Sequence, residues 1–238
     1  MTHSRRLGIL IWLAASLGMW LMISIGNAEE DVESGMNQHH HMEATETMAS
    51  PQIHADPHMR LTNPRPPTPE DQQRAEQILQ ALRASLEKYK DYRVALEDHY
   101  KPFLPKLPLP RYHFTNYWYG FKGAFKFDPA KPTSLIYRKT KDGYELLGAM
   151  YTAPKRATEE QLNERVPLSV AQWHAHVNVC LPPKDNAKRA DWKKFGLKGS
   201  IATEDVCQEA GGTFYPQIFG WMVHVSPFES TPDKIWAH

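Results

Sequence analysis

Apolar residues recur at helical spacing in the first half of the chain. The members of this stripe are Ala75, Ile78, Leu79, Leu82, Leu86, Tyr89 and Leu96. Spacings of three and four residues place them on one face of a helix, and such a face packs against a protein core. Thr68 can cap this helix, and Pro69 suits its first position. The pattern predicts one amphipathic helix from Thr68 to about His99.

From Arg111 onward the pattern changes to that of strands. Aromatic residues dominate residues 112–127, and the runs 134–139 and 144–152 flank Asp142-Gly143, a strong hairpin signal. The later elements predicted are strands at about 168–181, 214–219 and 221–226, and short helices from Thr158 to Arg165 and from Thr203 to Gly211.

Together these elements predict a single α+β domain over residues 68–238. One long N-terminal helix is expected to pack on a curved, mostly antiparallel β-sheet, open or barrel-like. Residues 182–200 are polar and rich in lysine, which is typical of a long surface loop.

The stretch most informative about function is Trp173 to Cys180, which reads Trp-His-Ala-His-Val-Asn-Val-Cys. Because a strand sends alternate side chains to opposite faces, one face is apolar and suits a core. The other face carries His174, His176, Asn178 and Cys180. Two imidazoles two residues apart on a rigid strand can bind one metal ion when a further donor comes from elsewhere.

Two other predicted strands offer that further donor. His224 lies in Gly-Trp-Met-Val-His-Val, and His113 lies in Tyr-His-Phe-Thr-Asn. Imidazoles from adjacent strands can reach one ion, since neighbouring strands lie about 4.8 Å apart. The predicted metal ligands are therefore His174, His176, His224 and, as an assisting fourth, His113. Asn178, Thr115 or Tyr117 could hold these ligands through hydrogen bonds.

Each of these residues also has a plainer interpretation. A strand histidine is usually half-exposed and bonded to a backbone carbonyl. Cys180 could ligate copper beside the histidines or form a disulfide with Cys207, and the two roles exclude each other. The even cysteine count favours the disulfide in an oxidising compartment.

The first 28 residues have the features of a signal peptide. Arg5 and Arg6 precede an uncharged apolar run from Leu7 to Ile25, and the small residues Gly26-Asn27-Ala28 offer a cleavage site. The run is also long enough to stay in the membrane as an anchor. Export by the general or by the twin-arginine route remains open. In either case we expect the mature chain to be periplasmic or secreted.

Residues 29–67 contain few large apolar groups, so we expect them to form a disordered tether. The tether is rich in histidine and methionine, namely Met36, His39, His40, His41, Met42, Met48, His54, His58 and Met59. Thioether and imidazole donors together suit copper, so this segment could collect the ion. The alternative is a polar linker in which the histidines have no role.

Charge and the remaining motifs exclude several classes of function. Without residues 1–28 the chain has 26 basic and 27 acidic residues. Recognition of nucleic acid needs a basic surface, so this near-neutrality argues against such a partner. The sequence also contains no glycine-rich phosphate loop, no Gly-x-Ser-x-Gly elbow and no His-Glu-x-x-His helix.

The His-x-His of the donor strand resembles the start of the cupin metal motif. Cys180 and Leu181 stand where that motif has a glutamate, so only the idea of histidines on antiparallel strands carries over. Over residues 85–238, the phrases Tyr-His-Phe-Thr-Asn-Tyr, Gln-Trp-His-Ala-His-Val-Asn and Trp-Met-Val-His-Val resemble an uncharacterised family of exported bacterial proteins. The resemblance implies a single folded unit and brings no known activity.

The sequence therefore predicts an exported protein that binds copper or zinc through strand histidines. Two alternatives stay open. A mononuclear metalloenzyme would use the same ligands and leave one position for water or dioxygen. A metal-free envelope protein would bind a small molecule or a protein partner instead. The expected partner is a metal ion and not nucleic acid, without stable membrane insertion once the signal is cleaved.

Overall fold

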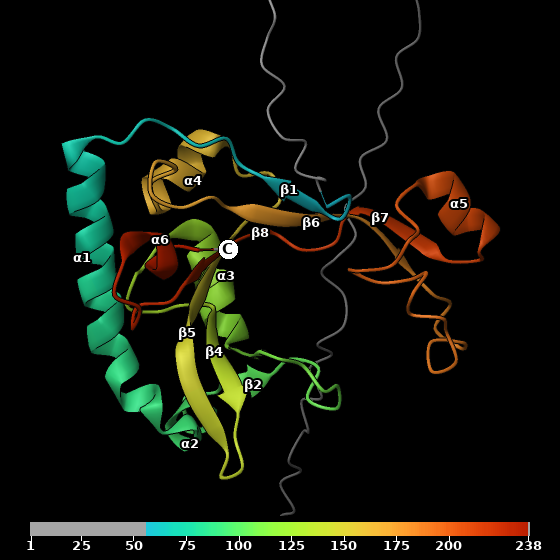
Figure 1. Ribbon diagram of the computed structural model, residues 1–238, viewed down its shortest axis with the longest axis horizontal. Coiled ribbons are helices and arrows are strands. Elements are labelled where there is room, and N and C mark those ends of the chain that lie inside the picture. The colour runs from blue at the N-terminus through green and yellow to red at the C-terminus, as the bar shows by residue number, and fades with distance from the viewer. Residues whose placement is uncertain (1–55, 238) are drawn as a thin grey trace, which may run out of the picture. The chain divides into compact units, whose positions relative to one another are not determined.

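The structure is a computed structural model that describes residues 56–237 (Figure 1). Its helices are α1 (Pro69–Leu86), the 3-10 helix η1 (Glu87–Lys90), α2 (Tyr92–Glu97), α3 (Tyr117–Phe125), α4 (Glu159–Arg165), α5 (Glu204–Glu209) and α6 (Pro232–Ile235). Its strands are β1 (Met59–Leu61), β2 (Lys101–Pro102), β3 (Tyr112–Thr115), β4 (Ser134–Lys139), β5 (Tyr144–Ala153), β6 (His174–Leu181), β7 (Thr213–Gln217) and β8 (Trp221–Val225). The predicted α+β class is confirmed.

The strands form an eight-stranded antiparallel sheet. Its order is β1-β6-β8-β5-β4-β3-β2, and β7 pairs with β6 beside this path. β1 and β2 lie at opposite ends of the order, so over the described residues the sheet is curved but not closed into a barrel. The register between β4 and β5 shifts at Ile136 and Tyr137, and such irregularities increase strand twist.

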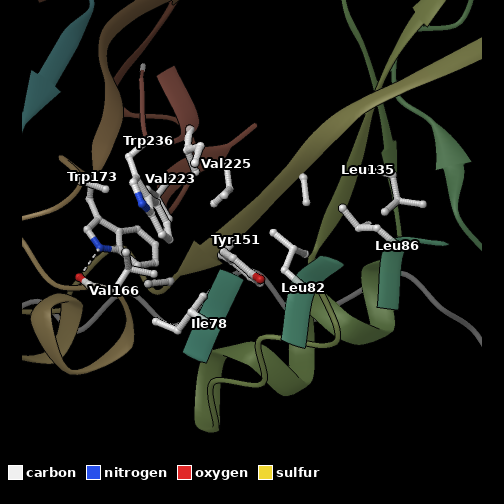
Figure 2. Close-up of a cluster of buried hydrophobic side chains, with 14 of the residues drawn as sticks. Ile78, Leu82, Leu86, Leu135, Tyr151, Val166, Trp173, Val223, Val225 and Trp236 are labelled. Atoms are coloured by element: carbon white, nitrogen blue, oxygen red, sulfur yellow. Dashed lines mark hydrogen bonds between the residues drawn. The ribbon is translucent and has the colours of Figure 1, made fainter. Parts of the chain in front are cut away.

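Helix α1 begins where the sequence predicts it. The Thr68 hydroxyl accepts a hydrogen bond from the Asp71 backbone N–H, and Pro69 occupies the first position. The buried side chains of the helix are Ala75, Ile78, Leu82 and Leu86, and they belong to the main core. Figure 2 shows Ile78, Leu82 and Leu86 pointing toward Tyr151 and Leu135 of the sheet. The amphipathic stripe therefore forms one side of the main core.

The expectation of one continuous helix from Thr68 to about His99 is wrong beyond Lys90. After η1 the chain takes an extended conformation at Asp91, with φ −87° and ψ 107°. The Asp91 carboxylate then accepts the backbone N–H of Arg93 and caps α2. Aspartate competes well for this capping role, so the apolar spacing alone does not keep the helix continuous.

The predicted strand over residues 112–127 is also wrong beyond Thr115. The Asn116 side chain accepts the backbone N–H of Tyr119 at 3.0 Å and starts α3. Asparagine is among the best N-caps, and here the cap outweighs the strand preference of the aromatic residues that follow.

The ordered part of the chain begins before the predicted boundary at residue 67. Strand β1 pairs with β6, and the buried Thr62 hydroxyl accepts the backbone N–H of Trp173 at 3.1 Å. These hydrogen bonds hold a segment that has few apolar side chains to bury. Residues 29–55 of the predicted tether, and the predicted signal peptide, lie outside the described residues.

A smaller lobe extends from the far end of β6 and includes β7 and α5 (Figure 1). Its own apolar cluster contains Cys180, Phe195, Ile201 and Cys207. Cys180 and Cys207 form a disulfide, which confirms the favoured interpretation and indicates an oxidising, extracytoplasmic location. Within residues 56–237, no helix has the length and apolar character needed to cross a bilayer.

Candidate functional site

The four predicted ligands lie on the face of the sheet that points away from the main core. Trp173, Ala175 and Val223 belong to that core, so their neighbours along β6 and β8 point to the other face. These neighbours are His174 and His176 on β6 and His224 on β8. On β3, the core residues Tyr112 and Phe114 flank His113 in the same way.

The four imidazoles form a chain of neighbouring rings, in the order His113, His224, His174 and His176. The ring centroids of His174 and His224 are 5.0 Å apart, and those of His113 and His224 are 5.5 Å apart. The rings of His174 and His176 are also separated by 5.5 Å. Nε2 of His113 lies 3.3 Å from Nε2 of His224. We call His113, His174, His176 and His224 the histidine cluster.

Curvature of the sheet brings the most distant members together. β3 and β8 are separated by β5 and β4 in the strand order. In a flat sheet three strand spacings would separate them by roughly 14 Å. The short contact between His113 and His224 therefore requires the sheet to curl toward the face that carries the histidines.

The cluster is partly shielded from solvent, with one of its four rings fully buried. His174 is 1% exposed, and the other three histidines are partly exposed. Burial lowers the pKa of His113, and positive charge on His176 or Arg111 lowers this pKa further. At His113 the environment thus favours the neutral imidazole, which is the form that can accept a hydrogen bond or bind a metal ion.

A methionine stands directly across the sheet from each of three cluster histidines. In the strand registers, Met59 pairs with His176, Met222 with His174, and Met150 with His224. Residues opposite each other share a face, and their Cβ atoms lie about 4.5–5.5 Å apart. Met150 and Met222 are each 7% exposed and pack together with Ile136.

Sequence reasoning did not connect Met59 and Met150 with the site. The alternation of side chains places Met222 beside His224 on one face, but partners on other strands depend on register. The sequence pattern places Met59 in the tether, whereas it lies in β1. The alternation of side chains along residues 144–152 could have indicated the face on which Met150 lies, but not its partner His224.

Several residues predicted around the ligands have other partners. Asn178 adopts a left-handed conformation with φ 54°, and its side chain donates to the Pro57 carbonyl, so the regular alternation stops there. The Thr115 hydroxyl bonds to that of Ser134. Tyr117 is exposed on α3, and Cys180 is held in the disulfide, which rules out its role as a ligand.

His58 also belongs to the fold and not to the tether. It is 3% exposed, and its Nε2 lies 2.6 Å from the Gly199 carbonyl oxygen, so it holds β1 against the smaller lobe. The remaining tether histidines and methionines, from Met36 to His54, lie outside the described residues.

As the side chains stand in residues 56–237, no group of three or more histidine, cysteine, aspartate or glutamate residues is arranged to hold a metal ion. The histidine cluster is thus a set of adjacent imidazoles, and metal binding remains a prediction.

The comparisons with known proteins add no assignment. No protein-family model matches the chain, and neither a curated protein nor a solved structure is significantly similar to it. The resemblance to exported bacterial proteins stays a prediction, so function has to be argued from the site itself.

Proposed function

We propose that this protein binds a transition-metal ion at the histidine cluster outside the cytoplasm, with copper as the first candidate and zinc as the second. The observation that carries the proposal is the meeting of four imidazoles from three strands. Disulfide formation supports the extracytoplasmic location, and the charge pattern of residues 1–28 supports export by a signal peptide.

The spacing of the rings suits shared coordination. Metal–nitrogen bonds of about 2.0–2.1 Å in a tetrahedral site place the nitrogens roughly 3.3 Å apart and the ring centres roughly 5 Å apart. Nε2 of His113 and Nε2 of His224 are separated by 3.3 Å, and the centroids of the three neighbouring ring pairs by 5.0–5.5 Å. Rotation of the His174 and His176 rings about their side-chain torsions would supply the remaining donors.

The paired methionines favour copper over zinc. Thioether sulfur is a soft donor that selects reduced copper, whereas zinc is bound by imidazole, thiolate and carboxylate. Met59, Met150 and Met222 each face a cluster histidine, so the same side of the sheet offers both donor types. Because His174 and two of these methionines are buried, the arrangement supports ion binding more than a catalytic site with an open position.

Metal titration of the chain from Glu29 onward tests this proposal. Reduced copper is kept in that state with ascorbate, and zinc is titrated separately, each against a competing chelator. We compare the wild type, the His174→Ala/His176→Ala variant and the control His99→Asn. His99 is exposed and has φ 65°, a conformation that asparagine tolerates.

The wild type and the control should bind one more equivalent of copper than the double variant, or bind it at least tenfold more tightly. Equal stoichiometry and affinity in all three would reject the strand site and leave the N-terminal histidines as the ligands. Failure of the wild type to bind either ion would reject the proposed function.

A further inference from the structure

Helix α3 exposes four aromatic side chains on one face. Tyr117, Trp118, Phe121 and Phe125 are 65%, 58%, 50% and 78% exposed, respectively. Their spacing of one, three and four residues places them on a single side of the helix. The rings of Trp118 and Phe121 are stacked with centroids 5.6 Å apart, and those of Phe121 and Phe125 are 5.2 Å apart. We call these four residues the aromatic face.

The opposite side of α3 is held firmly by the rest of the fold. Tyr119 packs against the main core and makes an edge contact with Tyr100 at 5.9 Å. The Arg165 guanidinium donates to the carbonyls of Gly123 and Ala124 near the helix end. The aromatic face is therefore presented to solvent by a fixed support, and continuous exposed apolar faces of this kind mark interaction sites.

Lysines border the aromatic face. The Lys122 ammonium lies 4.8 Å from the centroid of the Trp118 ring. A hollow of about 380 Å³ beside the helix is lined by Phe121 and Phe125 and by three lysines and one aspartate, namely Lys122, Lys126, Lys131 and Asp128. Lys131 and Asp128 form an ion pair at 3.0 Å, so two of the three lysine charges remain uncompensated within the hollow.

We infer that α3 binds the surface of an anionic phospholipid bilayer, with its aromatic face in the interfacial region and its lysines at the lipid phosphates. Tryptophan, tyrosine and phenylalanine with adjacent lysines are typical of side chains at the membrane–water boundary. Each lysine near an anionic surface adds attraction that salt weakens. Such peripheral binding involves no transmembrane helix.

A second copy of the chain fits the same face less well. In a symmetric dimer each patch meets its own copy, so the bordering lysines would approach one another. The four side chains expose roughly 500 Å² if an aromatic side chain offers about 200 Å². A stable interface needs about 800 Å² from each partner.

Sedimentation with lipid vesicles tests the inference on the chain that begins at Glu29, so that the apolar run before it cannot insert. Vesicles contain phosphatidylcholine alone or with 30% phosphatidylglycerol. The variants are Trp118→Ser/Phe125→Ser and Lys122→Gln/Lys126→Gln. The matched control is Trp192→Ser/Phe228→Ser, which removes two aromatic side chains that are 55% and 47% exposed elsewhere on the surface.

The wild type and the control should bind the anionic vesicles at least tenfold more tightly than either α3 variant, and 0.5 M salt should weaken this binding. Equal binding of all variants, or equal binding of the wild type to both vesicle types, would overturn the inference. So would a concentration-dependent dimer that only the aromatic α3 variant abolishes, because the aromatic face would then be covered by a second copy.

Discussion

Replacing methionine by leucine removes the thioether sulfur but keeps nearly the same side-chain volume. The substitution therefore distinguishes a role in metal binding from a role in packing. We expect Met59→Leu/Met150→Leu/Met222→Leu to lower the affinity for reduced copper about tenfold or more and to leave zinc affinity unchanged, because only the thioethers are lost. Competition titrations with both ions measure the two effects. An unchanged ratio of copper to zinc affinity would assign these methionines to packing alone.

Gly148 is required by a close approach of two strands. A Cβ atom at this position would lie 2.2 Å from the Val225 carbonyl oxygen on β8, and backbone cannot move aside cheaply. Gly148→Ala should lower the free energy of unfolding by about 1–3 kcal/mol, measured by urea denaturation. At Gly123 on α3 an added Cβ meets nothing within 4 Å. Gly123→Ala should be neutral or stabilise the protein by up to about 1 kcal/mol, and similar losses in both variants would contradict the argument.

Ionised Asp98 stabilises the fold, and this contribution is lost at acid pH. A hydrogen bond from the Lys88 ammonium lowers the pKa of Asp98, and a second bond from the Tyr89 hydroxyl acts in the same direction. A carboxyl whose pKa is lower in the folded state stabilises the fold above its unfolded pKa, and this contribution is lost as pH falls through the folded pKa. Asp98→Asn should therefore flatten the decline of unfolding free energy between about pH 5 and pH 2.

The size of this effect is modest, because the Asp98 side chain is 35% exposed. The control is Glu229→Gln, which removes an exposed carboxylate. Equal pH slopes in the Asp98 variant and the wild type would contradict the prediction.

Residue-scale prediction from sequence succeeds where it depends only on alternation. His174 and His176 share a face because they lie two apart on one strand, and the same rule orients His224. The partners Met59 and Met150 escape this rule, since a shift of one residue in register would put them on the other face.

At the scale of elements, α3 depends on its cap. The Asn116 side chain accepts the Tyr119 backbone N–H and donates to the Asp98 carbonyl at 2.9 Å. Asn116→Ala should cost about 1–2 kcal/mol of unfolding free energy and reduce binding to anionic vesicles through loss of the helix. Asn116→Asp keeps the acceptor and should retain more of the helical circular-dichroism signal. Equal stability of the alanine variant and the wild type would show that packing of Tyr119 suffices.

Helices and strands are predicted correctly from the sequence where a few adjacent residues determine them. The hairpin β4–β5 around Gly143 and the capping box of Thr158 and Gln161 at α4 occur as expected, because each is determined by a few adjacent residues. The aromatic run after Asn116 favours a strand by intrinsic preference, and the Asn116 cap outweighs that preference in the structure.

At the scale of the whole molecule, the disulfide stabilises the smaller lobe. The bond joins residues 27 positions apart, and closing a loop of this length contributes about 3–4 kcal/mol in the chain-entropy model. Cys180→Ala/Cys207→Ala should raise hydrogen exchange in residues 182–217 and leave α1 and β5 protected, because the two apolar clusters are separate. Uniform loss of protection across the chain would show that the lobe and the main core unfold together.

The curl of the sheet could not be predicted from the sequence. Strand twist and the irregularity between β4 and β5 contribute to it, and neither is encoded in a short motif. The approach of His113 to His224 follows from this curl, so the sequence does not predict it.

The contact between His113 and His224 joins positions 111 residues apart, so these rings meet only after every strand between β3 and β8 has found its place. In an unfolded chain the same four imidazoles would not lie together. If the proposed ion binds at the histidine cluster, export in an unfolded state would require the ion to be acquired at the destination, and metal binding would become the last step of maturation.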